Sequence, residues 1–123
     1  MASIAPWLSV RDAAQALTFY TAAFEAVELE RLEDEAGQVV VAQLSIYGAD
    51  FWIQTDAASS PEAVNGLAVR MILTVDDPDA VFARAVTAGA TEINPIAEEH
   101  GWRIGRIADP FGHHWEIGRR LPD

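Results

Sequence analysis

The residues best suited to chemistry gather near the C-terminal end, in the stretch ADPFGHHWEIGRR at 108–120. It holds two adjacent histidines beside a glutamate, and these side chains can bind a metal ion or a polar ligand. Successive side chains of a strand point to opposite faces. We therefore expect His113 and Trp115 on one face, and His114 and Glu116 on the other. The two histidines cannot chelate one ion together.

Tryptophan is the second feature, because four tryptophans are many for 123 residues. An indole can stack on a flat organic ligand, but it can also fill a core or a dimer interface. Trp115 is expected in the core. Trp7, Trp52 and Trp102 are candidates for lining a cleft. For Trp52 and Trp102 a dimer interface remains the alternative.

Several other kinds of site find no support in the sequence. The absence of cysteine excludes disulfides, thiolate metal sites and cysteine nucleophiles. No Ser/His/Asp set is spaced for nucleophilic catalysis, and no glycine loop is suited to hold phosphate. His100 is expected in an exposed loop, where the neighbouring Glu98 and Glu99 would allow only weak, adventitious metal binding.

Charge and hydropathy exclude two classes of partner. The formal net charge is -11, and all eight basic residues are arginine. Nucleic acid is not an expected partner, because phosphate contacts need clustered basic side chains. No apolar run approaches the roughly 20 residues of a membrane span, and the first residues do not resemble a secretory signal. A cytoplasmic location is expected, and the acidic field would attract cations.

The elements that must position these residues occur twice. The first half predicts a strand at 3–10, a helix at 11–26, and strands at 27–33, 38–48 and 49–55, followed by a polar, turn-rich connection at 56–66. The second half predicts a strand at 67–77, a helix at 77–89, and strands at 91–97, 102–109 and 113–120. Asp12 and Asp77 are the expected N-caps of the helices.

The two halves align at a spacing of 65 residues, at which Val10 and Asp12 match Val75 and Asp77. This repeat predicts an α+β fold of two tandem βαβββ modules, at about 1–57 and 66–120. Each half is too small to bury its own sheet well. We therefore expect a single domain, 1–123, in which a cupped mixed sheet surrounds a cleft.

Alternation along the strands sorts the side chains between the core and this cleft. The residues expected in the core are Leu8, Val10, Leu44, Ile46, Val69, Met71, Leu73 and Val75. The residues expected to face the cleft are Trp7, Ser9, Gln43, Ser45, Arg70, Ile72 and Thr74.

The repeat, LSVRDAAQALTFYTAAF at 8–24 and DPFGHHWEI at 109–117 resemble the vicinal oxygen chelate superfamily, which includes glyoxalase I, bleomycin-resistance proteins and extradiol dioxygenases. The resemblance covers the whole chain and implies the same fold. The family's four metal-ligand positions would fall at Ala5, Gln43, Arg70 and Glu116.

Only Glu116 among these four suits a hard metal ion. Gln43 could offer a carbonyl oxygen, Ala5 offers nothing, and Arg70 would place a fixed positive charge at the metal position. The usual metal site is therefore expected to be lost. In its place Arg70 and Glu116 are expected to form an ion pair.

These observations predict a protein that binds a small organic molecule without a metal ion or cofactor. It is expected to be a homodimer, with a role such as antibiotic sequestration. The ligand is expected to be planar and cationic. Stacking is assigned to Trp7, Trp52 and Trp102, and polar orientation to Gln43, Arg70, His114 and Glu116. A second interpretation has Arg70 hold a carboxylate or carbonyl of the ligand. The alternative functions are a metal-dependent glyoxalase-like lyase, isomerase or dioxygenase, and a pure interaction module.

Overall fold

A computed structural model describes residues 3–65 and 69–122. The chain divides into two compact units, Met1–Ser60 and Pro61–Asp123. Each unit contains a four-stranded mixed sheet with the same strand pattern. The predicted α+β class and the predicted βαβββ repeat are therefore confirmed. A single domain built around a shared cleft stays a prediction.

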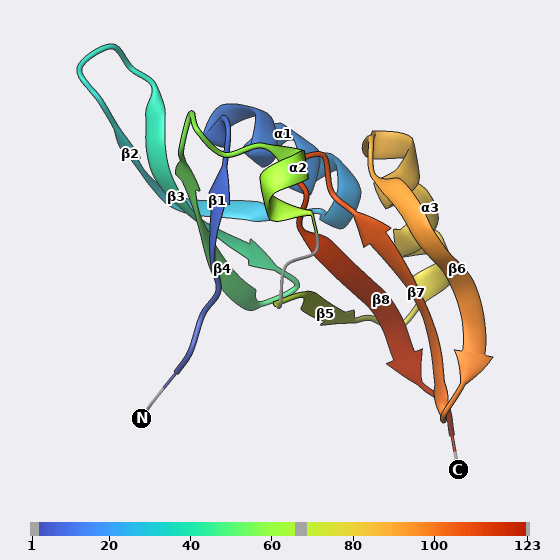
Figure 1. The fold of residues 1–123 in the computed structure, drawn as a ribbon. Coiled ribbons are helices and arrows are strands. Elements are labelled where there is room, and N and C mark those ends of the chain that lie inside the picture. Colours follow the sequence, from blue (N-terminus) through green and yellow to red (C-terminus); the bar gives the residue numbers. More distant parts are fainter. Residues whose placement is uncertain (1–2, 66–68, 123) are drawn as a thin grey trace. The chain divides into compact units, whose positions relative to one another are not determined.

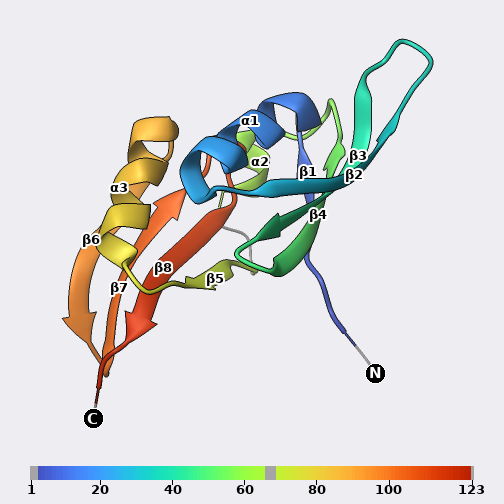
Figure 2. The same ribbon diagram turned by 180° about the vertical axis from the view of Figure 1, so that it is seen from behind.

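The first unit follows the predicted order of elements. They are β1 (Trp7–Val10), α1 (Ala13–Phe24), β2 (Val27–Glu33), β3 (Val39–Ile46) and β4 (Ala49–Thr55). The sheet order is β1-β4-β3-β2; β1 runs parallel to β4, and the other neighbours are antiparallel. Figure 2 shows α1 beside this sheet, with the β2–β3 hairpin extending from it.

Local signals fix α1, and its apolar face forms the core of this unit. The carboxylate of Asp12 accepts hydrogen bonds from the backbone of the first turn, as predicted for the N-cap. Tyr20 and Phe24 are fully buried, and the ring of Tyr20 meets Phe51 of β4 edge-on at 5.3 Å between centroids. The helix therefore covers one face of the sheet, and the side chains that point to the opposite face do not contact it.

The second unit repeats this arrangement. Its elements are α2 (Pro61–Val64), β5 (Met71–Thr74), α3 (Pro78–Ala88), β6 (Thr91–Glu99), β7 (Trp102–Ala108) and β8 (His114–Arg120). The sheet order is β5-β8-β7-β6, with β5 parallel to β8. Figure 1 shows α3 alongside the strands that it packs against, β6, β7 and β8.

The predicted caps of α3 are also present. Asp77 accepts a hydrogen bond from the backbone N–H of Ala80, Pro78 opens the helix, and Gly89 ends it with a φ of 125°. The helix lies very close to β7, because a Cβ added to Gly105 would be 2.8 Å from the ring of Phe82. None of the helices in the described ranges is long and apolar enough to cross a membrane.

Strand ends account for most of the errors of prediction. The first strand begins at Trp7 rather than at residue 3, β6 extends to Glu99, and the connection at 56–66 contains α2. Leu67 and Ala68, predicted to begin the strand at 67–77, lie outside the described residues. The prediction that Val69 belongs to the core is wrong, because Val69 precedes β5 and is 73% exposed.

The other core residues predicted around β5 differ in burial. Leu73 is buried, whereas Met71 and Val75 at the two ends are half-buried. In β1 and β3, Leu8, Val10, Leu44 and Ile46 are all buried as predicted.

Candidate functional site

The turn between β7 and β8 is organised by Asp109, whose side chain is only 4% exposed. One carboxylate oxygen accepts hydrogen bonds from the backbone N–H groups of Phe111 and His113, each at 2.9 Å. The other accepts from the indole N–H of Trp115, also at 2.9 Å. The DPFGH motif is thus a structural hairpin that fixes how β8 pairs with β7.

This pairing determines which side chains share the face of the sheet opposite α3. Arg106 of β7 and Ile72 of β5 are both register partners of Glu116. Trp115 and Ile117, the neighbours of Glu116 along β8, are buried. The predicted alternation along β8 is therefore confirmed, and the face opposite α3 carries Glu116 together with His114.

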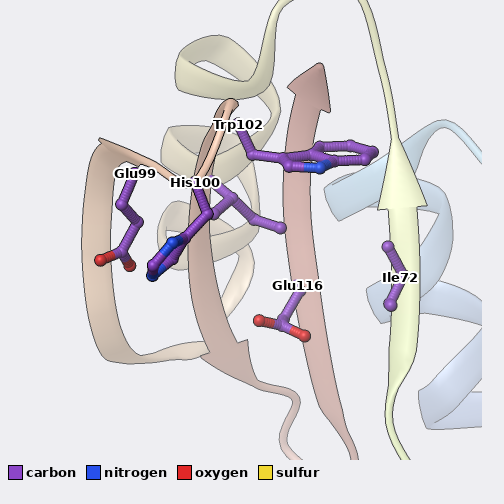
Figure 3. A pocket seen from close by; sticks show the side chains of 6 residues that line it. Ile72, Glu99, His100, Trp102 and Glu116 are labelled. Atoms are coloured by element: carbon purple, nitrogen blue, oxygen red, sulfur yellow. The ribbon is translucent and has the colours of Figure 1, made fainter. Parts of the chain in front are cut away.

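A pocket of about 340 Å³ lies on this face of the second unit, opposite α3. Figure 3 shows the indole of Trp102 reaching over β8 toward Ile72 of β5, with the carboxylate of Glu116 below it. The pocket is lined by Ile72, Glu99, His100, Trp102, Ile104 and Glu116. Its walls therefore combine one large aromatic ring and two aliphatic side chains with two carboxylates and an imidazole.

The predicted ion pair between Arg70 and Glu116 is confirmed. Arg70 donates from Nε to Oε2 of Glu116 at 2.5 Å. Nη2 of Arg106 lies 3.7 Å from the other carboxylate oxygen, which is too long for a hydrogen bond. The side chains of Arg70, Arg106 and Glu116 are 49%, 26% and 18% exposed, so the carboxylate is the most enclosed of the three charges.

His114 lies two residues before Glu116, on the same face of β8. Burial lowers the pKa of its imidazole, and the charges of Arg106 and Arg70 lower it further, while Asp109 acts in the opposite direction. The surroundings of the ring therefore favour its neutral form. Its Nε2 is buried and has no hydrogen-bond partner among the described residues, and the same is true of Nε of Arg106.

The first unit presents a different aromatic surface. The rings of Trp7 and Trp52 stack at 5.9 Å between centroids with an interplanar angle of 21°. Trp52 is the register partner of Trp7 and of Gln43, so all three share the face opposite α1. Trp7 is 52% exposed and donates from its indole N–H to Oε1 of Gln54 at 2.7 Å. The predicted orientation of Trp7 and Gln43 away from the core is confirmed.

The four metal-ligand positions implied by the resemblance do not fit a divalent cation. Ala5 is exposed and has no donor atom, and Gln43 lies beside Trp52 in the first unit. Arg70 and Glu116 bind each other in the second unit. Within residues 3–65 and 69–122, no three histidine, aspartate or glutamate side chains are grouped to hold a metal ion.

Four residues of this face were missed or misjudged from the sequence: Glu99, His100, Ile104 and Arg106. Alternation along WRIGRIA is the signal that finds two of them, because it places Trp102, Ile104 and Arg106 on one face. His100 is indeed exposed, but the turn it forms with Gly101, both at positive φ, also brings it to the pocket.

Comparison with known proteins gives the family of the chain. The glyoxalase-like domain family matches residues 7–118, which span both units. The chain belongs to this glyoxalase-like family. An uncharacterized protein of Mycobacterium bovis is 40% identical over 95% of this chain and 82% of its own length. An uncharacterized protein of Arabidopsis thaliana is 33% identical over 81% of this chain and 67% of its own length.

Solved structures agree on the fold. TioX from Micromonospora sp. ML1 has a TM-score of 0.77 at 25% identity, covering 98% of this glyoxalase-like chain and all of the TioX chain. A glyoxalase/bleomycin resistance protein/dioxygenase family enzyme from Burkholderia phytofirmans has a TM-score of 0.75 at 20% identity, covering 94% and 95%. The fosfomycin resistance protein FosX from Listeria monocytogenes has a TM-score of 0.74 at 16% identity, covering 97% and 93%. The family resemblance predicted from the sequence is thus confirmed.

Proposed function

We propose that this protein binds a small planar organic molecule in the pocket of its second unit, without a metal ion. The observation that carries the proposal is the indole of Trp102, which forms one wall of a pocket of about 340 Å³. Ligand sites are typically concave, mainly apolar and roughly 300–1,000 Å³ in volume, with a few polar groups that orient the guest. Here Trp102, Ile72 and Ile104 are the apolar surfaces, and Glu116 is a polar group.

The ion pair between Arg70 and Glu116 supports binding without metal. A divalent cation at Glu116 would have to displace the guanidinium of Arg70 from the carboxylate and then lie beside that positive charge. A carboxylate paired with arginine instead suits recognition of polar groups on an organic molecule. This argument favours a binding protein over a metal-dependent lyase, isomerase or dioxygenase.

A role in drug resistance fits this proposal. A protein that sequesters an antibiotic needs an aromatic site and no reaction centre. The fosfomycin resistance protein of Listeria monocytogenes has the same fold. The stacked pair of Trp7 and Trp52, together with Gln43, gives the first unit a second surface on which a flat molecule could stack.

Trp102→Leu tests the proposal, because leucine keeps an apolar wall but removes the aromatic face. The probe is naphthamide, a planar neutral molecule, and binding is measured by calorimetric titration. A stacked ring contributes about 1–3 kcal/mol, by analogy with base stacking, so affinity should fall roughly 5- to 150-fold. Trp7→Leu reports separately on the stacked Trp7–Trp52 surface, so a fall in affinity for Trp102→Leu that Trp7→Leu does not reproduce identifies this pocket. Equal affinities for Trp102→Leu and the parent protein would contradict the proposal.

We also propose that the protein is a homodimer. Strand β2 is an edge strand of its sheet, and three of its apolar side chains are about half exposed or more: Val27, Leu29 and Leu32. Apolar side chains grouped on an edge favour association. Sedimentation should show a dimer at micromolar concentration, and Leu32→Glu should shift it toward monomer. A monomeric parent protein under these conditions would contradict this.

A further inference from the structure

We propose that the ligand of this pocket carries an anionic group, a carboxylate or a similar planar oxyanion, which Arg106 and Arg70 bind beside Glu116. Neither arginine is among the six lining residues, and both border the pocket through Glu116. The inference rests on the proposed function and adds the chemical class of the ligand. It is opposite in charge to the ligand expected from the acidic composition of the chain. Three observations support it: the charges grouped around Glu116, a buried donor of Arg106 without a partner among the described residues, and the ion pair that engages Glu116.

The charges around Glu116 do not share the acidic excess of the whole chain. Arg70, Arg106 and Arg120 contribute three positive charges around Glu116, and Glu99, Glu116 and the buried Asp109, which acts on His114, contribute three negative ones, so the sum is 0 (3 − 3) against -11 for the whole chain. Arg120 belongs to this group because it pairs with Trp102 and lies 5.6 Å above its ring. Charges farther away than about 8 Å are largely screened at physiological salt. A ligand in the pocket therefore responds mainly to these local charges.

Arg106 has hydrogen-bonding capacity that the protein does not use. Its Nε is buried without a partner among the described residues, and its Nη2 is too far from Glu116 for a hydrogen bond. A buried donor without an acceptor is unfavourable, so such a group calls for a partner. Because this Nε has almost no accessible surface, a ligand reaches it only when the guanidinium turns toward the pocket. A planar oxyanion then supplies two acceptors in the geometry that a guanidinium matches.

Glu116 is a poor partner for a cationic ligand. Arg70 already binds one of its oxygens, and Arg106 lies near the other. A cation would therefore approach a carboxylate whose charge is compensated, next to two guanidinium groups that repel it. For an anion the signs reverse, and Glu116 becomes the one group nearby that opposes binding. Removal of its charge should therefore strengthen the binding of an anion and weaken that of a cation.

The experiment compares three probes that share one ring system and differ in charge: naphthoate, naphthamide and naphthylmethylammonium. Affinities are measured by calorimetric titration on the full chain. Naphthoate should bind tightest. Arg106→Gln should weaken naphthoate binding roughly ten- to hundredfold, the range for hydrogen bonds to a charged group. The same substitution should change naphthamide binding little.

Arg119→Gln is the matched control. Like Arg106→Gln, it removes one positive charge, but from strand β8. Arg119 is the register partner of Arg103, which binds Asp79 of α3, so Arg119 lies on the helix-facing side of the sheet. It should leave naphthoate binding unchanged, whereas Glu116→Gln should increase it. Circular dichroism establishes that each variant is folded.

The outcomes separate this inference from the proposed function. If all three probes bind equally and all depend on Trp102, the pocket binds planar molecules but the anionic class is wrong. If naphthylmethylammonium binds tightest and Glu116→Gln weakens it, the ligand class is cationic. If no probe binds, the proposed function fails with the inference.

Discussion

Asp109→Ala should be one of the most destabilising substitutions in the second unit. The change removes the acceptor of three hydrogen bonds, and two of the donors belong to the buried residues Phe111 and Trp115. Each buried donor left without an acceptor costs about 1–3 kcal/mol. The free energy of unfolding should therefore fall by about 2–6 kcal/mol. The assay is urea unfolding followed by circular dichroism.

The chain contains its own control for this prediction. Asp34 accepts hydrogen bonds from the backbone N–H groups of Ala36 and Gln38, at the same sequence offsets as Asp109 and also at 2.9 Å. The turn of Asp34 is exposed, so water can replace the carboxylate. Asp34→Ala should therefore reduce the free energy of unfolding by only about 1 kcal/mol. Equal losses for Asp34→Ala and Asp109→Ala would refute the reasoning.

Asp109→Asn isolates the bond to the indole. The amide can still accept from the backbone, but its NH₂ group would face the N–H of Trp115, donor against donor. We expect a loss of about 1–3 kcal/mol. The loss should be smaller when Trp115→Phe has already removed the indole donor, and a double-mutant cycle measures this coupling. Additive losses would show that the indole bond does not contribute.

Three further predictions concern other parts of the molecule. Because burial and two guanidinium groups hold the pKa of His114 below its ordinary value of about 6.5, the unfolded state takes up its proton first as the pH falls. The free energy of unfolding should therefore decrease from about pH 7 to about pH 5. The urea midpoint of His114→Gln should depend less steeply on pH than that of the parent protein, and an equally steep dependence would contradict this. Gly105→Ala should lower the free energy of unfolding by about 1–3 kcal/mol in urea, since the new Cβ would lie 2.8 Å from Phe82; an unchanged midpoint would argue against the close approach. The stacked rings of Trp7 and Trp52 should give an exciton-coupled circular dichroism band that either Trp→Phe change removes, and a band that survives both would show that the rings do not stack in solution.

The fold was largely predictable because its signals are local and occur twice. Asp12 and Asp77 cap their helices through a carboxylate and the first turn, which needs only the residue type and its position. The alternation of LSV and VVVAQLSI identified the buried faces of β1 and β3. Where β5 begins is decided by its pairing with β8, and nothing within the strand itself signals that Val69 lies outside it.

The site was only partly predictable because its parts come from distant segments. Arg70 and Glu116 were paired through a family resemblance, and the structure confirms that they touch. His100 and Glu99 reach the pocket through a turn in which His100 has a φ of 53° and Gly101 a φ of 82°. That turn conformation could not be read from residue types alone. The role of Arg106 depends on the register of β7 with β8.

The net charge of the chain and the charges around the pocket favour ligands of opposite charge. The sum of -11 predicts a cationic ligand, and this stays a prediction, but most acidic side chains lie away from the pocket. Around Glu116 three arginines balance three carboxylates, and Arg70 already binds Glu116. Because screening limits the range of exposed charges, the sign of the field at a site follows from its neighbours.

The most direct test of the central claim is to observe the four tryptophans separately while a ligand binds. Protein labelled with fluorinated tryptophan should give four fluorine NMR signals, which single Trp→Phe variants assign to Trp7, Trp52, Trp102 and Trp115. Naphthoate should shift the signal of Trp102 strongly, through the ring current of a stacked molecule, and leave buried Trp115 nearly unchanged. A Trp102 signal that stays in place at saturating naphthoate, naphthamide and naphthylmethylammonium would contradict the proposal that this pocket binds planar molecules.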